Sequence, residues 1–76
     1  MKITLESTTK IVHLNGVMCR VWEGTTERGV AMHAYIAMVA VDRDEDTKDF
    51  ERDLQEHRPP SVALAWIPDR MVRDPP

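Results

Sequence analysis

The fold of this chain is decided by residues 11–22, IVHLNGVMCRVW. Two apolar stretches flank the dipeptide Asn15-Gly16, and this arrangement is typical of a β-hairpin closed by a two-residue type I′ turn. The turn sets the register, because it places Leu14 opposite Val17 and every further pair follows. The pairs expected next are His13–Met18, Val12–Cys19, Ile11–Arg20, Lys10–Val21 and Thr9–Trp22.

The predicted hairpin has two chemically different faces, because side chains alternate along a strand. One face is apolar and carries Val12, Cys19 and Val21. The other face mixes aromatic, sulfur-containing and cationic side chains. Its members are Ile11, His13, Met18, Arg20 and Trp22, joined from the following strand by His33 and Tyr35.

Residues 30–42, VAMHAYIAMVAVD, form the longest apolar run. Alanine recurs at every third position of this run, which favours a helix. We nevertheless predict a strand, because a loop over residues 25–28, between Gly24 and Gly29, would continue the apolar face of the first hairpin without a slip. The pairs would then be Val21–Met32, Cys19–Ala34 and Val17–Ile36.

The two ends of the chain also have strand patterns. Residues 2–6 alternate, and they form either a separate edge strand or the front half of one long strand that leads into the hairpin. Residues 62–67, VALAWI, follow a rigid Pro-Pro connector and predict a last strand. Residues 69–76 are polar and end in prolines, so we expect a frayed tail.

A change to helical periodicity follows residue 42. Phe50 and Leu54 lie four residues apart, acidic residues near position 46 favour a helix start, and Pro59 prevents continuation. These features predict a helix from Asp46 to His57. The fold class is therefore α+β: a small antiparallel β-meander of four to five strands, with one acidic helix before the last strand, in a single domain over residues 1–76.

Charge is unevenly distributed along the chain. Residues 42–56 contain eight acids and three bases, a net charge of −5, and because the whole chain carries −3 the remainder carries +2. Along the predicted helix the acids form a stripe of Asp46, Asp49, Asp53 and Glu56. This stripe is either a solvated surface or an element that occupies a basic groove which otherwise holds nucleic acid.

The mixed face of the sheet also has two interpretations. If the helix packs over it, the face is half of the core. If the helix covers the Val12 and Val21 side, the face is exposed, and its aromatic, methionine and arginine residues are those enriched at interfaces. We favour the second arrangement because Arg20 and two histidines are costly to bury under a narrow helix. The expected partner-binding residues are then Met18, Arg20, Trp22 and Tyr35, together with the acidic stripe.

No catalytic or metal site is expected. The predicted register separates Cys19 from His13 and His33, and it brings no histidine and acid to either serine, so no ligand set or nucleophile is assembled. We expect no cofactor, no metal and no enzymatic activity. Scattered basic residues argue against direct nucleic-acid binding.

Length and composition complete the expectations. A 76-residue chain has a core near the lower limit for independent stability, so dimerisation would be a natural supplement. The single cysteine excludes an intrachain disulfide and fits a reducing cytoplasm. No apolar run is long enough for a membrane helix, and the first residues lack the apolar region of a signal peptide.

Several stretches carry a resemblance to a known group. Residues 1–12, 15–17, 21–24, 50–52, 54–56 and Arg58 resemble small proteins encoded by tailed phages and prophages. The resemblance covers about the first sixty residues and assigns no site residues. It implies a setting in the host cytoplasm. A protein of this kind would be an inhibitor of host defence, such as an anti-CRISPR protein that binds a host protein or ribonucleoprotein. The alternative is a self-associating structural or accessory protein.

Overall fold

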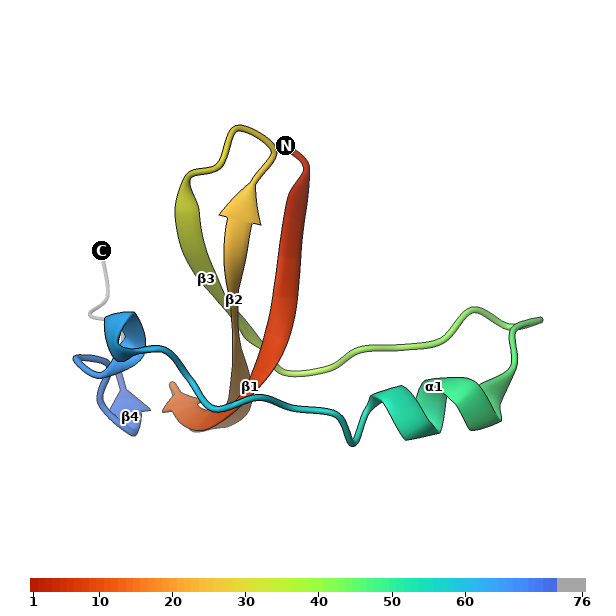
Figure 1. Cartoon of the computed structure of the whole chain (residues 1–76). Coiled ribbons are helices and arrows are strands. Elements are labelled where there is room, and N and C mark those ends of the chain that lie inside the picture. Colours follow the sequence, from red (N-terminus) through yellow and green to blue (C-terminus); the bar gives the residue numbers. More distant parts are fainter. Residues whose placement is uncertain (73–76) are drawn as a thin grey trace.

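The computed structural model describes residues 1–72 (Figure 1). Over these residues the chain is a small α+β protein with four strands, one α-helix and one 3₁₀ helix. The sheet order is β3-β2-β1-β4, with β4 parallel to β1 and the other pairs antiparallel, so the predicted pure antiparallel meander is wrong. The elements are β1 (Ile3–Leu14), β2 (Val17–Thr26), β3 (Ala31–Ile36), α1 (Thr47–Asp53), η1 (Val62–Leu64) and β4 (Arg70–Met71).

The first hairpin is confirmed near its turn. Asn15 and Gly16 both have positive φ, 51° and 82°, as a type I′ turn requires. The first four predicted pairs, from Leu14–Val17 to Ile11–Arg20, are all present. Residues 3–6 belong to the same ladder, so the front part of the chain and the hairpin share one long strand, β1, and there is no separate edge strand over residues 2–6.

A bulge at residues 8–10 of β1 ends the predicted register. Beyond it Trp22 pairs with Ser7 rather than with Thr9, and the predicted pair of Lys10 with Val21 is absent. Thr8 explains the irregularity: its buried hydroxyl donates to the Val21 carbonyl at 2.7 Å and accepts from the Lys10 amide at 3.2 Å. A polar side chain thus takes hydrogen bonds at a point where the bulge disrupts the backbone ladder.

The second hairpin forms with a different register. Val21 pairs with Tyr35 instead of Met32, a shift of three positions. The loop is tighter than predicted, because the Thr26 amide donates to the Val30 carbonyl and the Gly29 amide donates to the Thr26 carbonyl. Gly24 lies inside β2, where a Cβ atom would collide with the Thr4 carbonyl of β1.

When the pairing register of a strand changes by an odd number of residues, every side chain of that strand moves to the other face of the sheet. Tyr35 and His33 therefore share the face of Val21, and only Ala34, Met32 and Ile36 share that of Trp22. The predicted mixed face is wrong for these two residues. The strand also ends at Ile36, so the apolar run 37–41 is neither strand nor helix.

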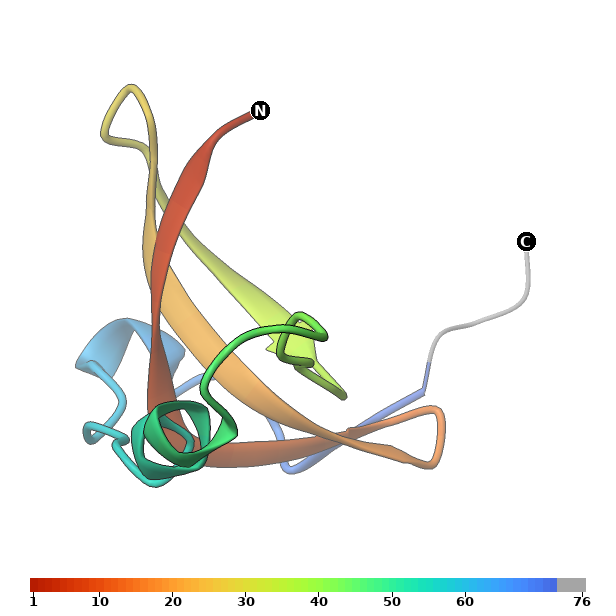
Figure 2. The same ribbon diagram turned by 90° about the vertical axis from the view of Figure 1, so that its right-hand side faces the viewer.

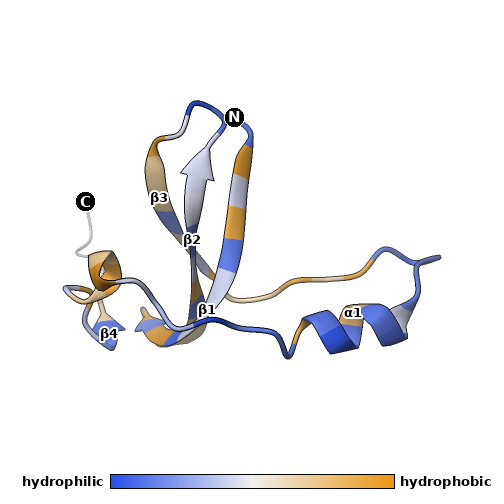
Figure 3. Ribbon diagram, viewed as in Figure 1, coloured by the Kyte–Doolittle hydropathy of each residue, from blue (hydrophilic) through white to orange (hydrophobic). Residues whose placement is uncertain are grey.

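The core lies on one face of the sheet and is small. Val12, Cys19, Val21, Leu64 and Ile67 are its buried hydrophobic residues. The expected last strand over residues 62–67 is wrong: η1 is followed by a turn, and the three-residue spacing of Leu64 and Ile67 places both against Val12 and Val21. Figure 3 shows this apolar turn and, in contrast, the mostly hydrophilic residues of α1.

The first residues of the predicted frayed tail include β4 (Arg70–Met71). β4 pairs in parallel with His13 and Leu14, and the Asp69 carbonyl accepts from the His13 amide at 2.8 Å. Residues 73–76 of the predicted tail lie outside the described residues.

Residues 37–57, which we call the acidic arm, extend away from the sheet and return to it (Figures 1 and 2). Asp46 caps α1 by accepting from the amides of Lys48 and Asp49, as predicted, but the helix ends at Asp53 rather than His57. No residue of α1 is buried. Phe50 and Leu54 line cavities together with Trp22, so the helix lies toward the Trp22 face and the prediction that it covers Val12 and Val21 is wrong.

Candidate functional site

The acidic stripe is exposed but is not one helical row. Asp49 and Asp53 belong to α1, whereas Asp46 is the cap and Glu56 follows the helix end. All four are exposed. Asp49 forms an exposed ion pair with Arg52 at 3.5 Å, while the Asp46 carboxylate is engaged by helix amides. An exposed pair of this kind contributes little to stability. Since all four carboxylates are at the surface, the charge of the stripe faces solvent.

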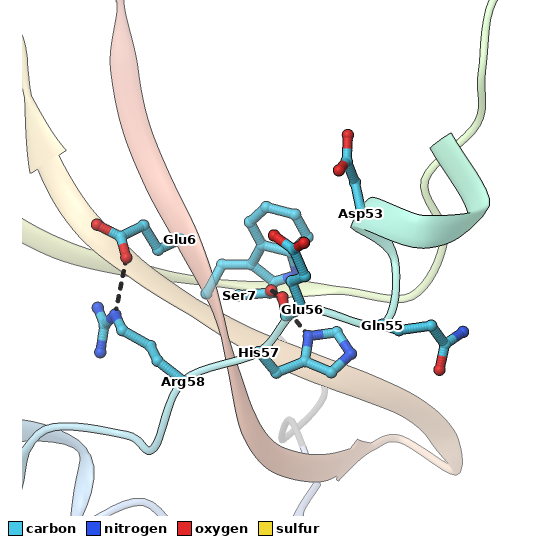
Figure 4. Close-up of a pocket in the computed structure, with 8 residues that line it drawn as sticks. Glu6, Ser7, Asp53, Gln55, Glu56, His57 and Arg58 are labelled. Carbon is cyan, nitrogen blue, oxygen red and sulfur yellow. Dashed lines mark hydrogen bonds and ion pairs between the residues drawn. The ribbon is translucent and has the colours of Figure 1, made fainter. Parts of the chain in front are cut away.

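A shallow cavity of about 580 Å³ lies where the arm returns to the sheet (Figure 4). Trp22 is one of the lining residues, and the ion pair between Glu6 and Arg58 lies at one side. Asp53 is at the other side. The lining combines an indole with several carboxylates. Its members are Glu6, Ser7, Trp22, Asp53, Gln55, Glu56, His57 and Arg58.

Ser7 and His57 meet in this cavity, which the sequence did not predict. The Ser7 Oγ lies 2.8 Å from His57 Nδ1 and donates to the Glu56 carbonyl at 3.0 Å. These two contacts orient the end of the arm against β1.

The backbone fixes the same contact. Residues 7–9 of β1 run parallel to Arg58: the Arg58 amide donates to the Ser7 carbonyl at 3.2 Å, and the Thr9 amide donates to the Arg58 carbonyl at 2.9 Å. The arm is thus held at its return point by three groups of hydrogen bonds. The first group is formed by the Ser7 hydroxyl with Glu56 and His57, and the second by the backbone of Arg58 with Ser7 and Thr9. The third is formed by the Arg58 side chain with Glu6 and Glu23.

Glu23 and Arg58 form a polar cluster with Ser61. Glu23 is only 8 % exposed. Its carboxylate accepts from Arg58 Nη1, from the Ser61 amide and from the Ser61 hydroxyl, each at 2.7 Å. Burial raises the pKa of Glu23, but these donors outweigh it and hold the pKa below its usual value. Glu23 is therefore ionised in the folded protein at neutral pH.

This cluster was not predicted from the sequence, although one sequence feature indicated a buried Glu23. Period-two alternation places position 23 on the face of Cys19 and Val21, so an acid there is directed toward the core. Its partners Arg58 and Ser61 come from a segment that no strand pairing connects to β2, and no pattern in the sequence identified them.

The structure places the proposed sheet-face residues on opposite faces of the sheet. Met18 is 63 % exposed at the hairpin end. Arg20 and Trp22 are half-buried on the same face, where Arg20 donates to the Thr8 carbonyl at 2.8 Å. Tyr35 lies on the opposite face, where it packs on the core and its hydroxyl is 3.1 Å from His33 Nε2. Tyr35 therefore does not join Trp22 in one surface.

Within residues 1–72, no three His, Cys, Asp or Glu side chains are grouped as a metal site. No helix in this part of the chain is long and apolar enough to cross a membrane. Comparison with family models, with curated proteins and with solved structures gave no match.

Proposed function

We propose that this protein is a non-enzymatic inhibitor that binds a host nucleic-acid-handling complex in the cytoplasm, as the phage anti-CRISPR proteins do. The exposed carboxylates of the acidic arm support the proposal. They occupy a segment that buries no helical residue and projects from a sheet whose own charge is nearly balanced. A basic groove that holds phosphates would attract such a segment.

The unneutralised charge of the arm supports binding through it. The described contacts neutralise few of its charges, because Arg52 is its only base in an ion pair there. Carboxylates that replace phosphates in a basic groove compete through the same counterion effects as nucleic acid, so the affinity should fall steeply with salt concentration.

The Trp22 face is the second part of the proposed contact. Trp22 lies where the arm rejoins the sheet, and Met18 is exposed on the same face. These side chains would supply apolar contact beside the charged arm, as aromatic and methionine residues do at interface centres. Tyr35 is no longer part of this surface, for the reason given above.

Reversing charge in the arm tests the proposal. The double variant Asp53→Lys/Glu56→Lys places one cation at the C-terminal end of α1 and one just after it, where cations interact favourably with the helix dipole, so the fold should be retained. We expect its affinity for a ribonucleoprotein captured from host lysate to fall at least about tenfold, with a shallower salt dependence. The measurement is surface plasmon resonance with the purified complex at several salt concentrations.

The matched control is Glu27→Lys/Asp69→Lys, which makes the same change in net charge at exposed positions outside the arm. Its affinity should stay within about twofold of the wild-type value, because screening weakens distant charges. Equal losses for the two double variants, or none for the arm variant, would remove the arm from the binding surface.

A further inference from the structure

One edge of the sheet is unprotected. β3 (Ala31–Ile36) contains no charged residue and no proline, and in the described chain it pairs with β2 alone. The opposite edge differs, since β1 is covered by β4 near its end and by Arg58 at Thr8. Soluble proteins normally blunt a free edge with charges, prolines or bulges, and β3 has none of these within its span.

The free peptide groups of β3 can be identified from the ladder. The Thr26 amide donates to the Val30 carbonyl, which makes this a hydrogen-bonded pair of the β2–β3 ladder. Because such pairs alternate in an antiparallel sheet, Met32, Ala34 and Ile36 bond to β2. Ala31, His33 and Tyr35 therefore direct their amides and carbonyls away from β2, toward the open edge.

Exposed apolar side chains lie beside this edge. The Trp66 ring is 6.0 Å from that of His33 between centroids, and yet Trp66 is 67 % exposed. Met38, two residues beyond the strand, is 81 % exposed. A strand added to β3 would bring apolar surface next to both side chains, so hydrogen bonding and apolar burial would occur together.

The whole molecule is less compact than a monomer of its mass. The accessible surface is 6338 Å², whereas a compact monomer of 8.7 kDa exposes about 4,700 Å². The radius of gyration is 13.9 Å, against about 11 Å for a compact chain of this length. The projecting acidic arm contributes to this surplus, and the exposed Trp66 and Met38 contribute at the β3 edge.

We propose that a second copy of this chain occupies the β3 edge. The two β3 strands pair antiparallel about a twofold axis and form one continuous eight-stranded sheet, with Trp66 buried at the junction. A second copy fits because a twofold axis presents the same uncharged edge from both sides. This interface does not use the acidic arm, so it does not depend on the proposed inhibitory function.

Two variants of this edge test the dimer. Ala31→Pro removes an amide that points to the open edge, a position at which proline is tolerated in a sheet. Trp66→Ser removes exposed apolar surface and leaves the buried core residues unchanged. We expect each variant to raise the dissociation constant of the dimer at least about tenfold. The matched control is Val72→Ser, which changes an exposed valine beside β4 at the other edge. This variant should leave the dissociation constant of the dimer unchanged.

Sedimentation velocity over a concentration series gives the readout. The wild-type chain should have twice the 8.7 kDa mass of the monomer. A wild-type monomer at submillimolar concentration would overturn the proposal, and so would a dimer that neither Ala31→Pro nor Trp66→Ser weakens. Asp53→Lys/Glu56→Lys should remain dimeric, so that loss of partner binding and loss of the dimer are separate results.

Discussion

Replacing Glu23 with glutamine should lower the free energy of unfolding by about 3 kcal/mol. The carboxylate accepts three short hydrogen bonds from Arg58 and Ser61, and an amide cannot accept all of them because one of its two ends is a donor. Urea denaturation at pH 7 gives the measurement. Glu27→Gln, an exposed acid in the next loop, should cost less than about 0.5 kcal/mol. Equal stability of the two variants would show that the cluster contributes nothing.

The same variant has a distinct pH dependence. The folded-state pKa of Glu23 lies below its ordinary value of 4.5, because the Ser61 and Arg58 donors outweigh the effect of burial. A depressed folded-state pKa stabilises the protein above the unfolded-state pKa, and this contribution is lost as the pH falls through the folded-state value. The difference in stability between the wild type and Glu23→Gln should therefore be constant near pH 7 and shrink below about pH 4.5. A difference that grows toward low pH would contradict the assignment.

Truncating Leu64 to alanine should cost about 3 kcal/mol. Leu64 is 2 % exposed and lies against Val12 and Val21 in a core of few residues, so little surrounding structure can close the space left behind. Val62→Ala is the matched control, because Val62 belongs to the same short helix and is 92 % exposed. Thermal and urea unfolding should separate the two variants clearly. A similar cost for both would mean that η1 does not seal the core.

The first hairpin was predictable because its cause is local. Asn15 and Gly16 fix the turn, and the turn fixes the four pairs nearest to it. The register beyond these pairs depends on the buried hydroxyl of Thr8, which is an interaction between two strands. Alternation of apolar residues contains no information about such a bulge.

The predictions for the second hairpin and for residues 62–67 were wrong for a related reason. Gly24 was interpreted as a turn residue, but it is needed in β2 because the β1 backbone passes too close for a side chain. Residues 62–67 have the apolar content of a strand. Only the tertiary structure shows that Leu64 and Ile67 use a three-residue spacing to fill the core.

The candidate site was predictable only in its charge. The composition of residues 42–56 made the exposed carboxylates an expectation, and the structure places all four stripe residues at the surface. The contacts that hold the arm, Ser7 with His57 and Arg58 with Glu23, join positions about 50 and 35 residues apart in the sequence. No local pattern identifies pairs at such separations.

One measurement tests most directly the claim that the acidic arm takes the place of nucleic acid. The captured host complex is titrated with this protein by calorimetry, first free and then saturated with its own nucleic acid. We predict that the saturated complex no longer binds the protein, or binds it with an affinity that falls in proportion to the nucleic acid present. Equal affinity for the free and the saturated complex would contradict the account.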